Sequence, residues 1–179
     1  KDEVLEALAE LGCWRIWIGA ESGSQRILDA MERGVTVEQV LFATQAAKRH
    51  GIQVGMFLMW GYEGETVDDI AATVELVRRA DPDVFLTTVS YPIKNTPYFN
   101  ALNDRVVATR EWATATDRDY EVRGRYPREL YRHADQWLRQ EVESHRLGAT
   151  DGAVAREQAR TARNAVLALA AESSVPAGR

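Results

Sequence analysis

The sequence predicts an α/β fold in which parallel strands form part of a (βα) barrel, followed by a mostly helical extension. Three apolar runs, at about 14–19, at 53–60 and from 84 onward, are typical of strands and alternate with helical patterns. This alternation indicates parallel strands joined by right-handed crossovers. The first two runs each stop at a glycine before a helix begins, and folds of this class bind ligands at the carboxyl ends of their strands.

The first helices are identified by the residues at their ends. Apolar residues at helical spacing within 4–11 predict a helix that Gly12 stops. Ser22 with Gln25 resembles a capping box, which predicts a short helix over 24–32.

The later helices of the sheet region have similar signals. Thr36 with Gln39 forms a second capping box, for a helix that continues to Gly51. Thr66 caps the next helix, which Asp81-Pro82 breaks before the third strand.

These elements divide the chain into two units. Three strands make a small sheet, the first strand still needs a neighbour, and the opening helix resembles the end of an earlier βα unit. We therefore infer that residues 1–102 are the second half of a barrel. Residues 103–179 form the extension, with a helix over about 128–145 and an alanine-rich helix over about 153–171.

Composition excludes several classes of protein. The 179 residues suit one domain with a real core, and the net charge of −5 argues against a broad basic surface for nucleic acid. No apolar run approaches the roughly 20 residues that span a bilayer. A single cysteine, Cys13, excludes an internal disulfide and a multi-cysteine metal site built from this chain alone, and it suits a reducing compartment such as the cytoplasm.

Two further expectations concern the chain start and the tryptophans. The chain opens on Lys1 rather than Met, so we expect that it begins inside a longer protein. We expect Trp14, Trp17 and Trp60 to pack in the core.

Glu21 is the first candidate binding residue, because it follows the end of a predicted buried strand between Gly19 and Gly23. Glycines there let a ligand approach the backbone, and a carboxylate in that position commonly accepts hydrogen bonds from ribose hydroxyls or an ammonium group. A first-turn carboxylate that stabilises the helix dipole is an equally good interpretation.

Two more segments lie at strand ends. The turn over 61–66 is either a backbone platform for a flat ligand such as adenine or a tight turn with acidic residues at a helix start, and the pattern alone favours the tight turn. The segment 90–97 contains two prolines, which suit a structured binding edge as well as a plain connection to the extension.

Several of these segments resemble those of a known family. Residues 19–28, Gly-Ala-Glu-Ser-Gly-Ser-Gln-Arg-Ile-Leu, resemble the strand-four segment of radical S-adenosylmethionine (SAM) enzymes, and most closely the class that also carries a cobalamin-binding domain. Segments 31–36, 61–66 and 91–97 fit the same pattern in the same order. The resemblance covers roughly residues 8–102.

The resemblance implies strands four to six of a six-strand partial TIM-type barrel. It implies an enzyme that reductively cleaves SAM at a [4Fe–4S] cluster, giving a 5′-deoxyadenosyl radical for hydrogen abstraction, methylation or cyclisation of an unknown small-molecule substrate. The cluster ligands, and any cobalamin domain, would lie outside this chain, whose partners would be the N-terminal half of the same barrel and a reductant protein such as flavodoxin or ferredoxin. Neither nucleic acid nor a membrane is implied, and this chain alone would be inactive.

The same resemblance assigns the cofactor-binding residues, while it names no catalytic residue and no metal ligand in this chain. Glu21 and Ser22 would contact the SAM ribose or amino group. Met59 and Gly61 would lie along the adenine, and Ser90 and Tyr91 would close that edge.

The sequence also departs from the family. The cluster loop Cys-x3-Cys-x2-Cys, the strand-two Gly-Gly-Glu segment and any cobalamin motif are absent from the chain, and Glu63 and Asn95 stand where the family has Pro and Gly. Glu65 lies one position beyond the usual glutamate, so a ribose contact by Glu21 is better supported than a role for Glu65.

Two other classes of function remain open. A non-catalytic, degenerate half-barrel that self-associates as a scaffold is the alternative, because an unpaired strand edge favours association. An ordinary barrel aldolase or isomerase has less support, since no lysine ends a strand and no histidine–carboxylate pair is visible.

Overall fold

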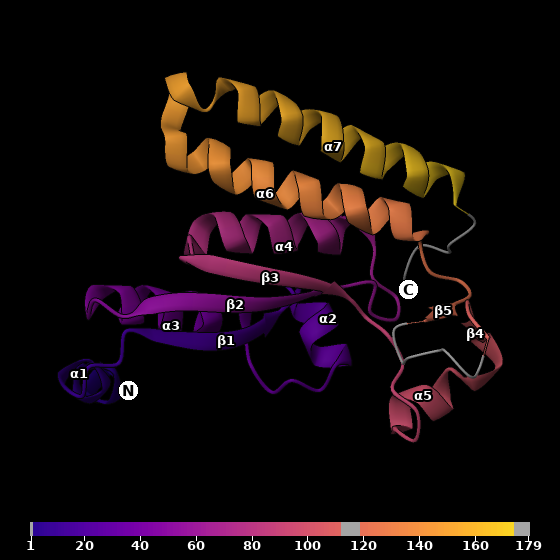
Figure 1. The fold of residues 1–179 in the computed structure, drawn as a ribbon, viewed down its shortest axis with the longest axis horizontal. Coiled ribbons are helices and arrows are strands. Elements are labelled where there is room, and N and C mark those ends of the chain that lie inside the picture. Colours follow the sequence, from indigo (N-terminus) through magenta and orange to yellow (C-terminus); the bar gives the residue numbers. More distant parts are fainter. Residues whose placement is uncertain (1, 112–118, 174–179) are drawn as a thin grey trace.

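The computed structural model describes residues 2–111 and 119–173, which form two sheets and their covering helices (Figure 1). In chain order the elements are α1 (Asp2–Glu10), β1 (Arg15–Glu21), α2 (Gln25–Ala30), α3 (Val37–Arg49), β2 (Gln53–Trp60), α4 (Val67–Ala80), β3 (Val84–Val89), α5 (Pro97–Ala101), η1 (Asn103–Arg105), β4 (Val106–Ala108), β5 (Tyr120–Val122), α6 (Arg128–Asp151) and α7 (Ala153–Glu172).

The larger sheet is parallel and has the strand order β1-β2-β3. This confirms the predicted α/β class with parallel strands and a helical C-terminal part. The predicted second strand has the observed bounds, Gln53–Trp60. The first strand extends further than predicted, so that Glu21 is its last residue rather than a residue beyond it.

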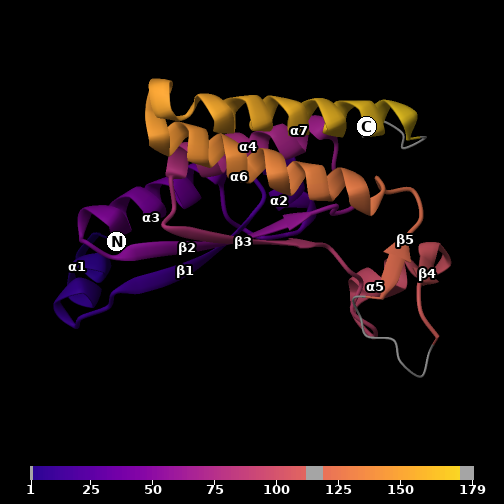
Figure 2. The same ribbon diagram turned by 45° about the horizontal axis from the view of Figure 1, so that its top comes forward.

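One face of this sheet is buried by helices. Strand residues such as Val54, Met56 and Leu58 join residues of α3 and α4 in one core cluster. Helix α6 packs against α4 and β3, and α7 lies on α6 as an outer layer (Figures 1 and 2). The α4–α6–α7 stack therefore covers the β3 end of the sheet.

The opposite face of the sheet is open among the described residues. Trp17, Phe57 and Leu86 lie on it, one from each strand, and expose 44%, 44% and 49% of their surface. The Trp17 ring stacks on Phe57 with centroids 4.8 Å apart and covers Gly55. Of the three tryptophans expected in the core, Trp60 is buried, whereas Trp17 and the 66% exposed Trp14 are not. Alternation along β1 places Trp17 on the face opposite the helices.

The predicted capping boxes have different outcomes. The box of Thr36 and Gln39 is confirmed, with both reciprocal hydrogen bonds present. The box of Ser22 and Gln25 is wrong, because α2 begins after Ser24 and the Ser22 hydroxyl is buried against Thr73. Helix α2 also ends at Ala30, earlier than predicted.

The extension contains a sheet that the sequence did not reveal. Strands β4 and β5 pair antiparallel, and each has only three residues, too few for a readable period. The two long helices agree with prediction, with a break in helical geometry at Gly148 inside α6. Among the described residues, no helix is both long and apolar enough to cross a membrane.

Candidate functional site

A β-bulge shapes the carboxyl end of β1. The register with β2 shifts between Gly19, which pairs with Phe57, and Glu21, which pairs with Leu58. Glu21 also has a positive φ of 56°, which is uncommon for a residue with a side chain. Bulges re-aim side chains at strand ends, and unusual backbone angles cluster at functional sites. The fold therefore holds Glu21 in a special orientation.

The Glu21 carboxylate lies over the Cα atom of Gly19. A methyl group at Gly19 would come within 2.9 Å of Glu21 Oε1 and 2.8 Å of Arg33 Nη2. Arg33 forms an ion pair with Glu21 at 3.4 Å, and the Glu21 side chain exposes 18% of its surface. Burial raises the pKa of the Glu21 carboxyl above its ordinary value, and the charge of Arg33 lowers it in part. Glu21 is thus a constrained carboxylate whose only described ion-pair partner is a half-exposed arginine.

Ser22 and Gly23 hold the segment after β1 against α4. The Ser22 hydroxyl is fully buried, contacts Thr73 Oγ1 at 3.3 Å and accepts a hydrogen bond from the Ser24 N–H. At Gly23 a Cβ atom would come within 2.2 Å of the Ala72 carbonyl oxygen. Gly23 therefore allows close packing on α4, and the ligand approach expected at this glycine stays a prediction. A SAM contact by Ser22 stays a prediction.

At the end of β2, Gly61 is enclosed by the protein. Its φ is +71°, and a Cβ atom there would come within 2.8 Å of Tyr131 Cζ. Its N–H donates a hydrogen bond to Glu65 Oε2 at 2.6 Å. Met59 lies two residues earlier and is half-buried. The adenine contacts predicted for Met59 and Gly61 stay predictions.

Glu65 is the most buried carboxyl group of this region, with 4% of its surface exposed. Its Oε1 atom has no hydrogen-bond partner among the described residues. Burial raises the pKa of Glu65 to about 8, despite the hydrogen bond from Gly61, which lowers it. In most molecules the Glu65 carboxyl group is therefore protonated at neutral pH.

At the end of β3, Ser90 joins the sheet to the extension. The Ser90 N–H donates to the Trp60 carbonyl at 2.7 Å, and its own carbonyl accepts from Arg125 Nη1 at 2.8 Å. Arg125 Nη2 donates to the Tyr98 hydroxyl. Tyr98 in turn stacks on Tyr62 of the β2–α4 turn, with ring centroids 5.1 Å apart. Arg125 therefore connects the strand ends with the extension.

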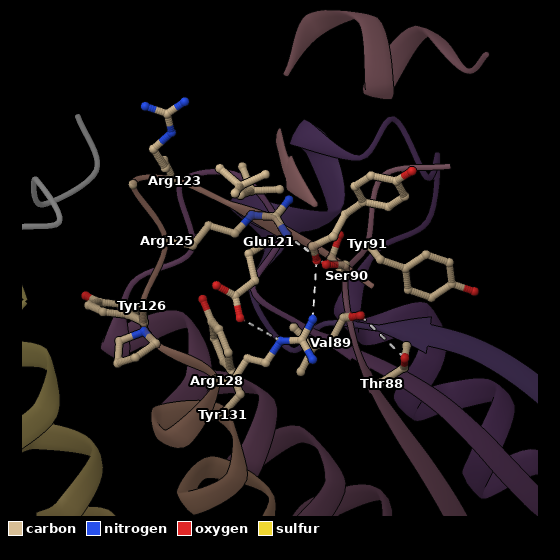
Figure 3. Close-up of a pocket in the computed structure, with 15 residues that line it drawn as sticks. Thr88, Val89, Ser90, Tyr91, Glu121, Arg123, Arg125, Tyr126, Arg128 and Tyr131 are labelled. Carbon is tan, nitrogen blue, oxygen red and sulfur yellow. Dashed lines mark hydrogen bonds and ion pairs between the residues drawn. The ribbon is translucent and has the colours of Figure 1, made fainter. Parts of the chain in front are cut away.

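A pocket of about 650 Å³ lies between the end of β3 and the β4–β5 hairpin (Figure 3). Ser90 and Tyr91 line it, together with residues of β5, of the segment after it and of the start of α6. In Figure 3 Glu121 and Arg128 point toward one another, and their ion pair measures 3.3 Å. The volume is that of a typical small-molecule site.

The predicted site residues thus fall into two groups. Ser90 and Tyr91 share this pocket with the extension, whereas Glu21, Met59 and Gly61 do not line it. The sequence reasoning did not single out the contributions of Arg33, Arg125 and Tyr131. The segment Gly124-Arg125-Tyr126 was the available signal for Arg125, and its Gly124 has a φ of +82°.

The described residues contain no group of three or more histidine, cysteine or acidic side chains that could hold a metal ion. Cys13 is the single cysteine of the chain, so three thiolate ligands of an iron–sulfur cluster cannot come from this chain alone.

Comparison with known proteins gives a family match and several curated relatives. Residues 1–77 match the family model of the radical SAM superfamily. An uncharacterized methyltransferase of Pyrococcus horikoshii is 30% identical over 120 residues, which cover 66% of this chain and 26% of that protein. A putative methylthiotransferase of Methanocaldococcus jannaschii is 32% identical over 95 residues, or 53% of this chain and 21% of that protein.

A tRNA-2-methylthio-N(6)-dimethylallyladenosine synthase of Mycolicibacterium paratuberculosis is 37% identical over 84 residues, which are 44% of this chain and 16% of the synthase. The chain therefore spans about a quarter or less of the length of these relatives. The parallel sheet and these matches agree, and residues 1–77 of the chain belong to the radical SAM superfamily.

Proposed function

We propose that this chain supplies the C-terminal half of a radical SAM barrel, with Glu21 as the residue that binds the SAM ribose. The carboxylate of Glu21 at the end of β1 carries the proposal. It is fixed by a bulge, it lies over a glycine, and its partner Arg33 is exposed enough to move away when a ligand binds. A carboxylate in this setting can accept two hydrogen bonds from a ribose diol.

The open face and edge of the parallel sheet support an N-terminal half as partner. Among the described residues, β1 pairs only with β2, so its other edge is available to a further strand. Trp17, Phe57 and Leu86 would face the interior of a closed or partly closed barrel. This chain covers only 26% and 21% of the length of two relatives, which agrees with the proposal that it is part of a longer protein.

In the complete protein the [4Fe–4S] cluster, on three cysteines of the N-terminal half, would supply the electron that cleaves SAM. The residues of this chain hold and orient SAM. Glu21 fixes the ribose, and the turn after β2, held by Glu65 and packed against Tyr131, forms a rigid edge along the adenine. A flavodoxin or ferredoxin in a reducing cytoplasm would deliver the electron.

The relatives favour group transfer over cyclisation, because those reported above are named methyltransferase, methylthiotransferase and tRNA-2-methylthio-N(6)-dimethylallyladenosine synthase. The proposed reaction class is therefore methylation or methylthiolation of an unidentified substrate. Exposed apolar residues on the open face equally favour the alternative, a self-associating scaffold without catalysis.

The decisive experiment is S-adenosylhomocysteine binding to the native protein isolated from its source cells, measured by calorimetry. Glu21→Gln is expected to weaken binding by about 10- to 100-fold, since each hydrogen bond to a charged group contributes about 1.5–3 kcal/mol. The control is Glu38→Gln, at an exposed carboxylate in the first turn of α3. Equal affinity of the Glu21 variant and the wild type would refute the ribose role, and a native protein that binds no S-adenosylhomocysteine would favour the scaffold.

A further inference from the structure

We propose that the pocket between the end of β3 and the β4–β5 hairpin binds a small aromatic molecule with a carboxylate or phosphate group. Its lining includes Arg125, Arg128, Glu121 and four tyrosines, and Glu121 forms an ion pair with Arg128. If the chain acts as proposed above, this molecule is the substrate, because Ser90 and Tyr91 would stand between the pocket and SAM. Oxyanion binding itself does not depend on that function.

The charges of the pocket oppose those of the whole chain. The chain has a net charge of −5, yet the pocket lining contains three arginines, Arg123, Arg125 and Arg128, and one acidic residue, Glu121. In Figure 3 Arg123 extends away from the other labelled side chains, so Arg125 and Arg128 are the relevant cations. A local excess of positive charge in a concave site attracts anions.

Arg125 is already positioned for binding. Its two terminal nitrogens are held by the Ser90 carbonyl and the Tyr98 hydroxyl. Its Nε atom is buried and has no partner among the described residues. A buried donor without an acceptor costs free energy, and an oxyanion is the strongest acceptor for a guanidinium group. Because Arg125 is immobilised in advance, little additional entropy is lost when a ligand binds.

Arg128 lies in the first turn of α6 and forms an ion pair with Glu121. Their ion pair is exposed on both sides, with 56% of each side chain accessible, so it contributes little free energy. An incoming oxyanion can therefore displace Glu121 from Arg128 at small cost. Glu121 repels anions in the same place, which makes it the residue that tunes the affinity.

The walls of the pocket suit a planar ring. Four tyrosines, Tyr91, Tyr120, Tyr126 and Tyr131, line it. Tyr131 is buried and fixed against Gly61, so its ring is a rigid surface. Aromatic rings offer offset stacking or edge-to-face contacts to a flat ligand. A volume of about 650 Å³ accommodates a metabolite of one or two rings.

The test uses the full 179-residue chain with three related fluorescent probes, 1-naphthyl phosphate, 1-naphthoate and uncharged 1-naphthol. We expect at least one anionic probe to bind about tenfold more tightly than 1-naphthol, with an affinity that falls as salt rises. The stronger of the two anions identifies phosphate or carboxylate as the natural group. Equal binding of all three probes would overturn the proposal.

Variants separate the pocket from general surface charge. Arg128→Gln is expected to weaken the anionic probe about tenfold, and Glu121→Gln to strengthen it several-fold, a gain that misfolding cannot produce. Arg132→Gln is the matched control, because Arg132 lies one turn further along α6, pairs with Glu129 at 2.8 Å and does not line the pocket. Equal losses for Arg128→Gln and Arg132→Gln would refute the site.

Two further measurements distinguish this pocket from the proposed SAM site and from an RNA-binding site. Glu21→Gln should leave probe binding unchanged while it weakens S-adenosylhomocysteine, so each proposal can fail without the other. A 5′-phosphorylated RNA oligonucleotide that competes for the pocket far better than 1-naphthyl phosphate would overturn the assignment to a small molecule.

Discussion

Glu65 Oε2 accepts a hydrogen bond from the backbone N–H of Gly61 at 2.6 Å, across the turn that joins β2 to α4. The other carboxyl oxygen of Glu65 is buried and has no partner among the described residues. On the far side of the turn, the Tyr131 ring lies against the Cα atom of Gly61. One buried acid and one aromatic ring from the extension therefore fix the turn proposed to hold the adenine.

The first prediction concerns the pH dependence of stability. The pKa of Glu65 is about 8 in the folded chain, against an ordinary value of 4.5. Between these values the folded state retains a proton that the unfolded state has lost. The free energy of unfolding therefore falls as pH rises from about 4.5 to about 8, by roughly 1.4 kcal/mol per pH unit at most. Glu65→Gln should flatten this slope in urea unfolding at pH 5 and pH 8.

The control for Glu65 is Glu75→Gln. Glu75 is an exposed carboxylate whose pKa is lowered by its hydrogen bonds with Arg78. It titrates below this pH window, so its variant should retain the wild-type slope. An unchanged slope in Glu65→Gln would mean that another group is responsible.

The second prediction concerns the contact between Gly61 and Tyr131. Gly61→Ala is expected to destabilise the chain by about 2–4 kcal/mol. The added methyl group would clash with Tyr131, and the positive φ of this position is unfavourable for alanine. Gly34→Ala is the matched control, because Gly34 also has a positive φ, +64°, and nothing lies within 4 Å of the added atom. It should cost only about 1–2 kcal/mol. Equal losses in thermal unfolding would show that the Tyr131 contact adds nothing.

The third prediction concerns the open face of the sheet. Trp17→Asp should reduce the binding of the uncharged dye Nile red to the isolated chain and reduce its self-association in sedimentation velocity. The reason is that a carboxylate would interrupt the apolar patch of Trp17, Phe57 and Leu86. Phe42→Asp is the control, at a 52% exposed residue of α3. A larger effect at Phe42 would place the associating surface on the helices instead.

The fourth prediction concerns the protonation of Glu21. Burial raises the pKa of this carboxyl, and a ribose diol binds its ionised form better. Affinity for S-adenosylhomocysteine should therefore decrease as pH falls, with a midpoint above that of an ordinary glutamate. In Glu21→Gln this acid-side decrease should be absent. An identical pH profile for both proteins would exclude Glu21 from the titration.

The sequence predicted the parts of the fold that depend on local patterns. The run 53–60 is apolar enough to identify a strand covered by helices, and the box of Thr36 and Gln39 fixed the start of a helix. The sequence did not predict the strands β4 and β5, because a strand of three residues is too short to show an alternating pattern. The box of Ser22 and Gln25 was wrong because Thr73, distant in sequence, buries the Ser22 hydroxyl.

In the candidate site, too, local patterns were predictable from the sequence and contacts between distant residues were not. By itself the sequence determined that a carboxylate, Glu21, lies at the carboxyl end of the first strand, just past its predicted last residue, since a glycine-flanked acid after an apolar run is a local pattern. Only the tertiary structure decided how this carboxylate is oriented, through a bulge set by pairing with β2 and an ion pair with Arg33. It also decided that Arg125 meets Ser90 and that Trp17 is exposed. These features depend on which segments meet in space, and such contacts between distant residues leave no periodic signal in the chain.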